Sequence, residues 1–85
     1  MKTYNFTFHT DPSHGWIEVP MTTILALGLA GKISPYSYKD RAKAYLEEDC
    51  DAGLLYEAIK ASGDEIKLDY KHTDGDCFVR NLPRF

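Results

Sequence analysis

The sequence predicts an α+β fold, in which a largely antiparallel sheet of about six strands is packed by two short helices in the order ββαββαββ. Three observations predict this class. Short segments with alternating apolar and polar residues occur in pairs, turn-forming residues separate the members of each pair, and two stretches with helical apolar spacing lie between the pairs. The 85 residues, 1–85, are expected to form a single compact domain, because chains this short rarely divide.

The first pair of strands is expected over residues 4–9 and 16–19. The aromatic residues Tyr4, Phe6 and Phe8 alternate with the polar residues Asn5, Thr7 and His9, which is typical of a half-buried strand. Residues 11–15 between them are rich in turn formers, so a hairpin is predicted. Pro20 ends the second strand, because proline has no N–H for the ladder, and it suits the first turn of a helix.

A short helix is expected over residues 21–29, where apolar residues form a helical stripe that Gly28 can close. The second pair of strands is expected over residues 33–38 and 42–47. The polar residues Lys39-Asp40-Arg41 form the predicted turn between them.

The second helix is the clearer of the two and is centred on residues 55–59, where apolar positions recur three and four residues apart. Either Asp49 or Asp51 can cap it by accepting hydrogen bonds from the free N–H groups of the first turn. Gly63 is a natural stop for this helix.

A last hairpin is predicted from residues 66–72 and the segment that ends at Pro83. Asp74-Gly75 is a strong signal for a two-residue turn between two strands. Folding about this turn places His72 opposite Cys77, Tyr70 opposite Val79 and Asp69 opposite Arg80.

The apolar stripes of these elements predict a small core that depends on aromatic side chains. Aromatic residues make up 13% of the chain, and large rings bury much surface per residue. The residues expected to be mostly buried are Phe6, Trp16, Leu25, Leu46, Leu55, Ile59 and Tyr70.

The composition counts against several classes of function. The net charge is −3 and no cluster of Lys and Arg occurs, which disfavours general binding to phosphate backbones. No apolar run approaches the roughly 20 residues of a membrane span, and the alternating N-terminus does not form the apolar region of a signal peptide. No phosphate-binding loop or dinucleotide fingerprint is present. We therefore expect a cytoplasmic protein without a cofactor, with neither membrane nor nucleic acid as its partner.

The two cysteines, Cys50 and Cys77, have a spacing that fits no zinc or redox motif. A disulfide framework in a chain of this size would normally contain more cysteines. We therefore expect two free thiols in a reducing compartment.

Two surface segments are candidates for partner binding. The first is an acidic run with no Lys or Arg inside it, whose charge exceeds what one helix terminus can neutralise. The second is the loop before the second strand, where a Trp close to a His would suit recognition, although this Trp could equally occupy the core. The candidate partner-binding residues are Glu47, Glu48, Asp49, Asp51, His14 and Trp16.

A small enzyme or metal protein is the alternative interpretation, organised around His72, Cys77 and the acidic cluster. Across the predicted hairpin His72 and Cys77 would supply two ligands at most. Thiolate–imidazole catalysis would also need an orienting group, and no catalytic residue is assigned.

The stretches HGWIEVP, KISPYSY and YLEEDCDA, with the ending HTDGDCFVRNLPRF, resemble a family of small uncharacterised proteins encoded by phages and prophages. The resemblance covers nearly the whole chain. It implies expression inside an infected bacterium, but no activity or catalytic residue, since none is established for the family. Family members often have a Gly in the central turn, where this chain has Lys39-Asp40-Arg41.

A second likeness concerns residues 17–28, which look like half of a swapped-hairpin transcription factor of the AbrB type. Those proteins use basic residues at the DNA face, whereas this segment has only Lys32 nearby. The resulting expectation is a non-enzymatic protein-binding module or inhibitor that acts on a host protein with a basic surface. The small enzyme or metal protein and the nucleic-acid-binding regulator stay as alternatives.

Overall fold

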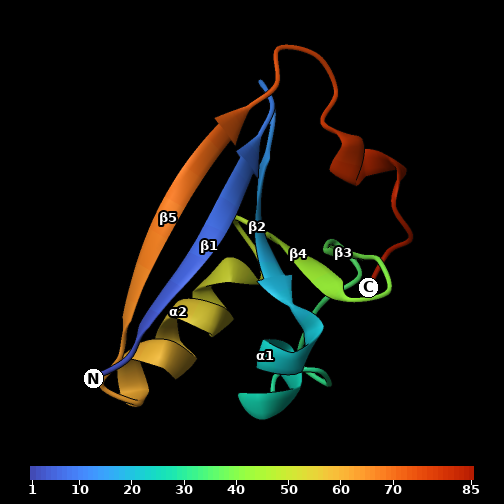
Figure 1. Ribbon diagram of the computed structural model, residues 1–85. Helices are drawn as coiled ribbons and strands as arrows, with labels where there is room; N and C mark the ends of the chain where they lie inside the picture. Colours follow the sequence, from blue (N-terminus) through green and yellow to red (C-terminus); the bar gives the residue numbers. More distant parts are fainter.

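The computed structural model describes all residues, 1–85, and shows a five-stranded mixed sheet with two α-helices, so the α+β class is confirmed. The strand order across the sheet is β3-β4-β2-β1-β5 (Figure 1). The strands are β1 (Thr3–Thr10), β2 (Gly15–Pro20), β3 (Tyr38–Lys39), β4 (Lys43–Glu47) and β5 (Glu65–His72). The helices are α1 (Met21–Ala26), α2 (Ala52–Ala61) and the 3₁₀ helix η1 (Phe78–Asn81).

The first predicted hairpin is confirmed, with β1 and β2 antiparallel and Phe8 opposite Ile17. The N–H of Asp11 donates to the carbonyl of His14 within the turn. A side chain at Gly15 would place its Cβ 2.4 Å from the Phe8 ring, so only glycine fits where the second strand begins.

The predicted last hairpin is wrong. Strand β5 instead lies parallel to β1, with Thr3 opposite Glu65 and Thr10 opposite His72. Residues 73–77 leave the sheet and lead into η1, so the three cross-strand pairs predicted about Asp74-Gly75 do not form. Alternation shows that a segment is a strand but not which strand lies beside it, and the sixth strand is therefore absent.

The strand expected over residues 33–38 is also wrong, since only Tyr38–Lys39 pairs with β4. Residues 33–37 lie outside the sheet and include a turn. The turn predicted at Lys39-Asp40-Arg41 lies one residue later, because Lys39 belongs to β3 and residues 40–42 connect it to β4. The Asp40 carboxylate accepts hydrogen bonds from the N–H groups of Ala42 and Lys43. This polar turn holds the short β3–β4 pair together.

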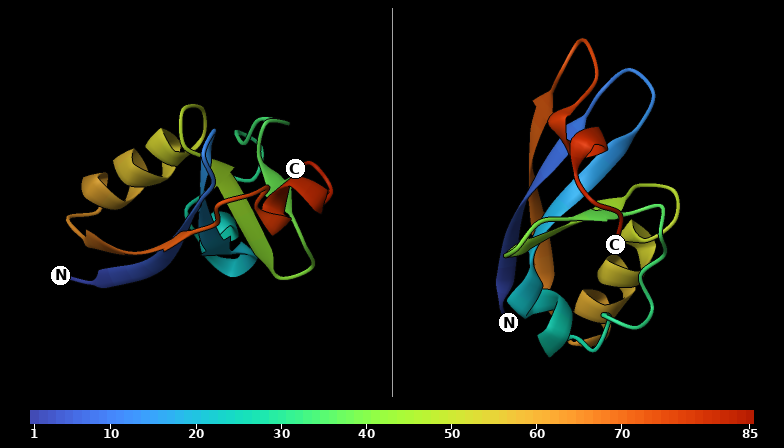
Figure 2. Two further views of the ribbon diagram at one scale, coloured as in Figure 1. Left: turned by 90° about the horizontal axis from the view of Figure 1, so that it is seen from above. Right: turned by 90° about the vertical axis from the view of Figure 1, so that its right-hand side faces the viewer.

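The sheet is covered on both faces. On one face α1 and α2 enclose a cluster that includes Ile17, Ile24 and Leu55. On the other face the C-terminal segment, residues 77–85, packs Cys77 and Val79 against Trp16 and Tyr45. Figures 1 and 2 show α2 and this C-terminal segment on opposite sides of the sheet.

The predicted core is confirmed for the buried residues Phe6, Trp16, Leu46, Leu55 and Ile59. It is wrong for two residues. Leu25 is 62% exposed, because the six-residue α1 turns the fully buried Ile24 towards the sheet and its neighbour outwards. Tyr70 is 70% exposed, since it lies towards the end of the edge strand β5, where its ring packs against Phe8 and has no strand on its other side.

Both helices end as predicted, with Gly28 and Gly63 in the left-handed conformation at φ values of 70° and 77°. The expected carboxylate cap of α2 is not formed, since Asp51 occupies the N-cap position without a side-chain capping bond. Neither helix has the length and apolar character needed to cross a membrane.

Replacing the fully buried Leu55 by alanine should lower the free energy of unfolding by about 2–4 kcal/mol, because apolar contacts are lost and a cavity remains. Chemical denaturation followed by circular dichroism measures this loss. Leu25→Ala is the matched control and should change stability by less than about 0.5 kcal/mol. Equal losses in the two variants would contradict the orientation of both helices.

Candidate functional site

A surface pocket of about 360 Å³ lies at the junction of four chain segments: the start of β2, the β3 region, the β4–α2 connection and the C-terminal segment. Its lining consists of His14, Trp16, Tyr36, Tyr38, Glu47, Asp49, Cys50, Arg80 and Arg84. The two surface segments singled out from the sequence therefore meet here. Four of the six candidate residues line the pocket, whereas Glu48 and Asp51 do not.

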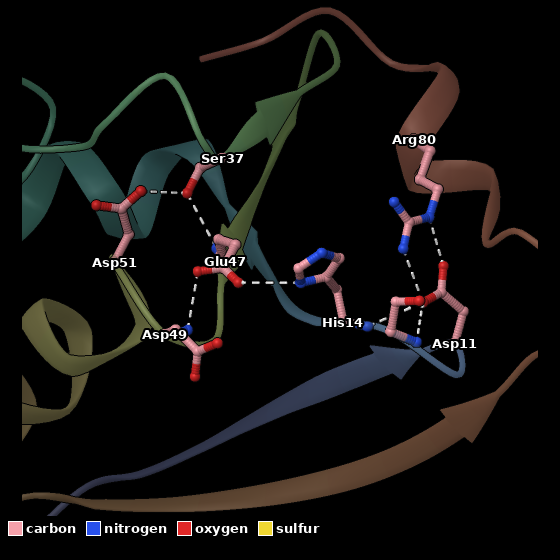
Figure 3. Close-up of polar contacts among 8 residues, drawn as sticks. Asp11, His14, Ser37, Glu47, Asp49, Asp51 and Arg80 are labelled. Atoms are coloured by element: carbon pink, nitrogen blue, oxygen red, sulfur yellow. Dashed lines mark hydrogen bonds and ion pairs between the residues drawn. The ribbon is translucent and has the colours of Figure 1, made fainter.

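Glu47 forms part of the pocket wall and is only 7% exposed. Its carboxylate accepts a hydrogen bond of 2.8 Å from the N–H of Asp49, and its other oxygen lies 3.6 Å from Nδ1 of His14 (Figure 3). A hydrogen bond to the same carboxylate raises the pKa of the exposed Cys50 thiol. Glu47 thus organises this wall of the pocket and is not a free surface charge.

Asp51 is 2% exposed and has a structural role. Its carboxylate accepts hydrogen bonds from the N–H and hydroxyl of Ser34 and from the hydroxyl of Ser37. The Ser37 oxygen in turn accepts the N–H of Glu47 at 3.0 Å (Figure 3). These bonds fix residues 33–37 to the start of α2, which explains why this segment is not a strand and why Asp51 does not cap the helix.

Only Glu48 and Asp49 of the acidic run have exposed side chains. The backbone of Glu48 is held by a hydrogen bond from its N–H to the carbonyl of Gly15. No hydrogen bond or ion pair engages either of these two carboxylates. The free negative charge of the run is therefore carried by Asp49, which lines the pocket, and by Glu48, its neighbour in the chain; these two residues form the acidic rim.

Trp16 is a buried residue of the pocket lining that contacts Tyr38 and Arg80. Its ring packs edge-on against Tyr38, with centroids 6.2 Å apart, and the Arg80 guanidinium lies 5.2 Å from the ring centre. Its Nε1 is the one buried side-chain nitrogen or oxygen without a hydrogen-bond partner. A buried N–H without an acceptor costs free energy, and the molecule carries this cost beside its pocket.

The C-terminal side of the pocket is fastened by Asp11, whose buried carboxylate receives five hydrogen bonds. The N–H groups of Ser13 and His14 donate to one oxygen, and the N–H of Cys77 donates to the other. Arg80 donates from both Nε and a terminal nitrogen (Figure 3). The Arg80 guanidinium holds the pKa of the Asp11 carboxyl well below its usual range.

The sequence interpretation missed the basic and tyrosine side of the pocket. Arg80 was predicted to face Asp69 in a hairpin, and the wrong hairpin concealed its contact with Asp11. Arg84 donates to the carbonyl of Pro35 and lies over the ring of Tyr38. The available signal for this side of the pocket was the presence of Arg80 and Arg84 near the end of a chain with a net negative charge.

The alternative site at His72 and Cys77 is not assembled. Cys77 is buried beside Trp16, whereas His72 is exposed on β5 and its Nδ1 lies 2.8 Å from the hydroxyl of Thr10. No group of three or more His, Cys, Asp or Glu side chains has a metal-binding arrangement.

Comparison with known proteins gave no match to a family model, to a curated protein or to a solved structure.

Replacing Arg80 by glutamine should lower the free energy of unfolding at neutral pH, because the buried Asp11 carboxylate loses its cation. The pKa of Asp11 is lowered in the folded protein, so its ionised form contributes stability above the unfolded pKa near 3.9. This contribution is lost as the pH falls through the folded-state pKa.

The difference in unfolding free energy between wild type and Arg80→Gln should therefore be constant above about pH 5 and shrink below about pH 4. Urea denaturation across this pH range measures it. A difference that stays constant in acid would show that Asp11 and Arg80 do not interact as a charged pair.

A thiol reagent should modify one cysteine in the native protein and two after denaturation, because Cys50 is exposed and Cys77 is buried. The raised pKa of Cys50 should make its reaction slow at neutral pH and faster in alkali. Cys50→Ser should abolish the native reaction. Two native equivalents would contradict the burial of Cys77 against Trp16 and Tyr45.

Proposed function

We propose that this protein is a non-enzymatic binding module that receives a basic, extended segment of a partner protein in the pocket beside Trp16. The observation that carries the proposal is the convergence of four separate chain segments on one concave site, whose lining combines aromatic side chains with the unpaired carboxylate of Asp49.

The charges around the pocket favour a basic occupant. The charge of Arg80 is balanced by Asp11, whereas the guanidinium of Arg84 keeps its charge and is held by the carbonyl of Pro35 and the ring of Tyr38. By contrast the carboxylates of the acidic rim are exposed and unpaired, that of Asp49 in the pocket lining and that of Glu48 beside it in the chain. A Lys or Arg side chain of the partner would neutralise this rim at little desolvation cost.

The aromatic side chains favour an extended peptide over a flat surface. Tyr36 is largely exposed and stands beside the pocket, where it offers a ring face to a cationic or apolar side chain. Aromatic anchors with a polar rim are typical of peptide-binding surfaces.

The resemblance to phage-encoded proteins would make the partner a protein of the host cell, met in its cytoplasm. Inhibition of that protein follows if the bound segment is one that it needs for its own contacts. An enzyme built on His72 and Cys77 is not proposed, since the two side chains are separated.

The partner can be captured through Cys50, the exposed thiol in the pocket lining. A photo-reactive group attached there should cross-link a host protein, and its basic segment should then be made as a peptide. Because Trp16 is the one tryptophan of the chain and lines the pocket, its fluorescence reports binding of that peptide directly.

The double variant Glu48→Lys, Asp49→Lys should bind the peptide about tenfold or more weakly at low salt, with a difference that shrinks as salt screens the charges. The matched control Glu57→Lys, Asp74→Lys makes the same change in net charge away from the pocket and should bind like wild type. Equal affinity and equal salt dependence in the two variants would exclude this rim as the binding site.

A further inference from the structure

Strand β5 is an eight-residue edge strand with one side unpaired (Figure 1). The N–H of Glu65 bonds to Lys2 and the N–H of Thr73 bonds to Thr10. In a parallel ladder alternate residues face the neighbouring strand, so the odd-numbered residues of β5 bond to β1. The N–H and C=O groups of Ile66, Leu68 and Tyr70 therefore point outwards and have no neighbour in the sheet.

An exposed edge of this length is a template for strand addition, and charged side chains normally guard against it. The charges of β5 lie on one face, at Glu65, Lys67, Asp69 and Lys71. Their neighbours across the ladder in β1 are Thr3, Asn5, Thr7 and His9, none of which is a carboxylate, Lys or Arg, and no ion pair within the chain engages any of the four charges. The order of these four charges along β5 therefore determines which strand can pair with this edge.

The order of charges along β5 is complementary to itself when two copies run antiparallel. If a second copy of β5 pairs in the antiparallel direction with Leu68 opposite Leu68, then Glu65 faces Lys71 and Lys67 faces Asp69, each twice by symmetry. Opposite charges directly across a strand pair are stabilising. All four charged residues gain a partner in this register.

Neighbouring registers are disfavoured by the same side chains. A shift of two residues in one direction places Asp69 against Asp69 and Lys67 against Lys71. The opposite shift places Lys67 against Lys67 and Glu65 against Asp69. Like charges directly across are destabilising, so one register is selected.

The apolar face supports this register as well. Ile66 falls opposite Tyr70 of the second copy, and Tyr70 is the most exposed aromatic side chain of the protein. The outward main-chain groups of Ile66, Leu68 and Tyr70 then pair with one another across the two-fold axis.

We infer that two copies of this chain associate through antiparallel pairing of their β5 strands, centred on Leu68, into one continuous sheet. Because β5 and β3 are at opposite ends of the strand order, the pocket stays open in both copies. This inference does not depend on the proposed function, and a single strand pair is a small interface that should give concentration-dependent association.

Sedimentation velocity of the wild type at low salt should show a mass that rises with concentration from 9.7 kDa towards twice that value. Lys67→Glu and Asp69→Lys should each raise the dissociation constant about tenfold or more, because two attractive pairs become repulsive. The double swap Lys67→Glu, Asp69→Lys restores opposite charges across the axis and should restore association.

An equimolar mixture of the two single variants gives the sharpest test. In the mixed pair, positions 67 and 69 are both acidic in the Lys67→Glu chain and both basic in the Asp69→Lys chain. Both cross-strand contacts then join opposite charges, so the mixture should associate although neither variant does so alone.

Circular dichroism confirms that each variant is folded. A wild type that stays monomeric at all concentrations, single variants that associate like wild type, or a mixture that fails to associate would each overturn the inference.

Discussion

The structure depends on one buried carboxylate, that of Asp11, and on the five hydrogen bonds it receives. These bonds join the first hairpin turn to a segment more than sixty residues further along the chain. Without them the segment around Cys77 and Arg80 would lose its tie to the hairpin, and the cover over Trp16 would loosen. Water replaces the hydrogen bonds of this ion pair less readily than those of a surface salt bridge, because five donors surround the buried Asp11 carboxylate.

The local elements could be predicted from the sequence because they depend on near neighbours. Alternation identifies β1 and β5, helical spacing identifies α2, and Gly63 ends that helix through its own backbone freedom. The partner of β5 could not be predicted, since alternation is the same whichever strand lies beside it. The signal at Asp74-Gly75 marked correctly where the chain leaves β5, but burial of Val79 against the far face outweighed a hairpin at the edge.

The candidate site was predictable to the extent that unusual composition marks it. A run of carboxylates and a Trp close to a His are visible in the sequence, and the structure brings Glu47, Asp49, His14 and Trp16 to one pocket. The sequence could not show which carboxylates of the run are free and which accept hydrogen bonds within the protein. Asp51 and Glu47 look the same as Glu48 in composition, yet serine hydroxyls and backbone N–H groups engage the first two. Such pairing depends on residues that only the fold makes neighbours.

The parallel pairing of β1 with β5 has a consequence for synthesis of the chain. Strand β1 ends at Thr10, whereas its partner begins at Glu65, so the ribosome must add about 55 residues between them. At a translation rate of roughly 5–20 residues per second, synthesis of these residues takes roughly 3–11 seconds, during which β1 has no β5 beside it. During that interval Phe6 and Phe8 lie beside an open edge, where chaperones or other nascent chains can reach them. Strand β1 is thus made well before the strand that closes its second edge.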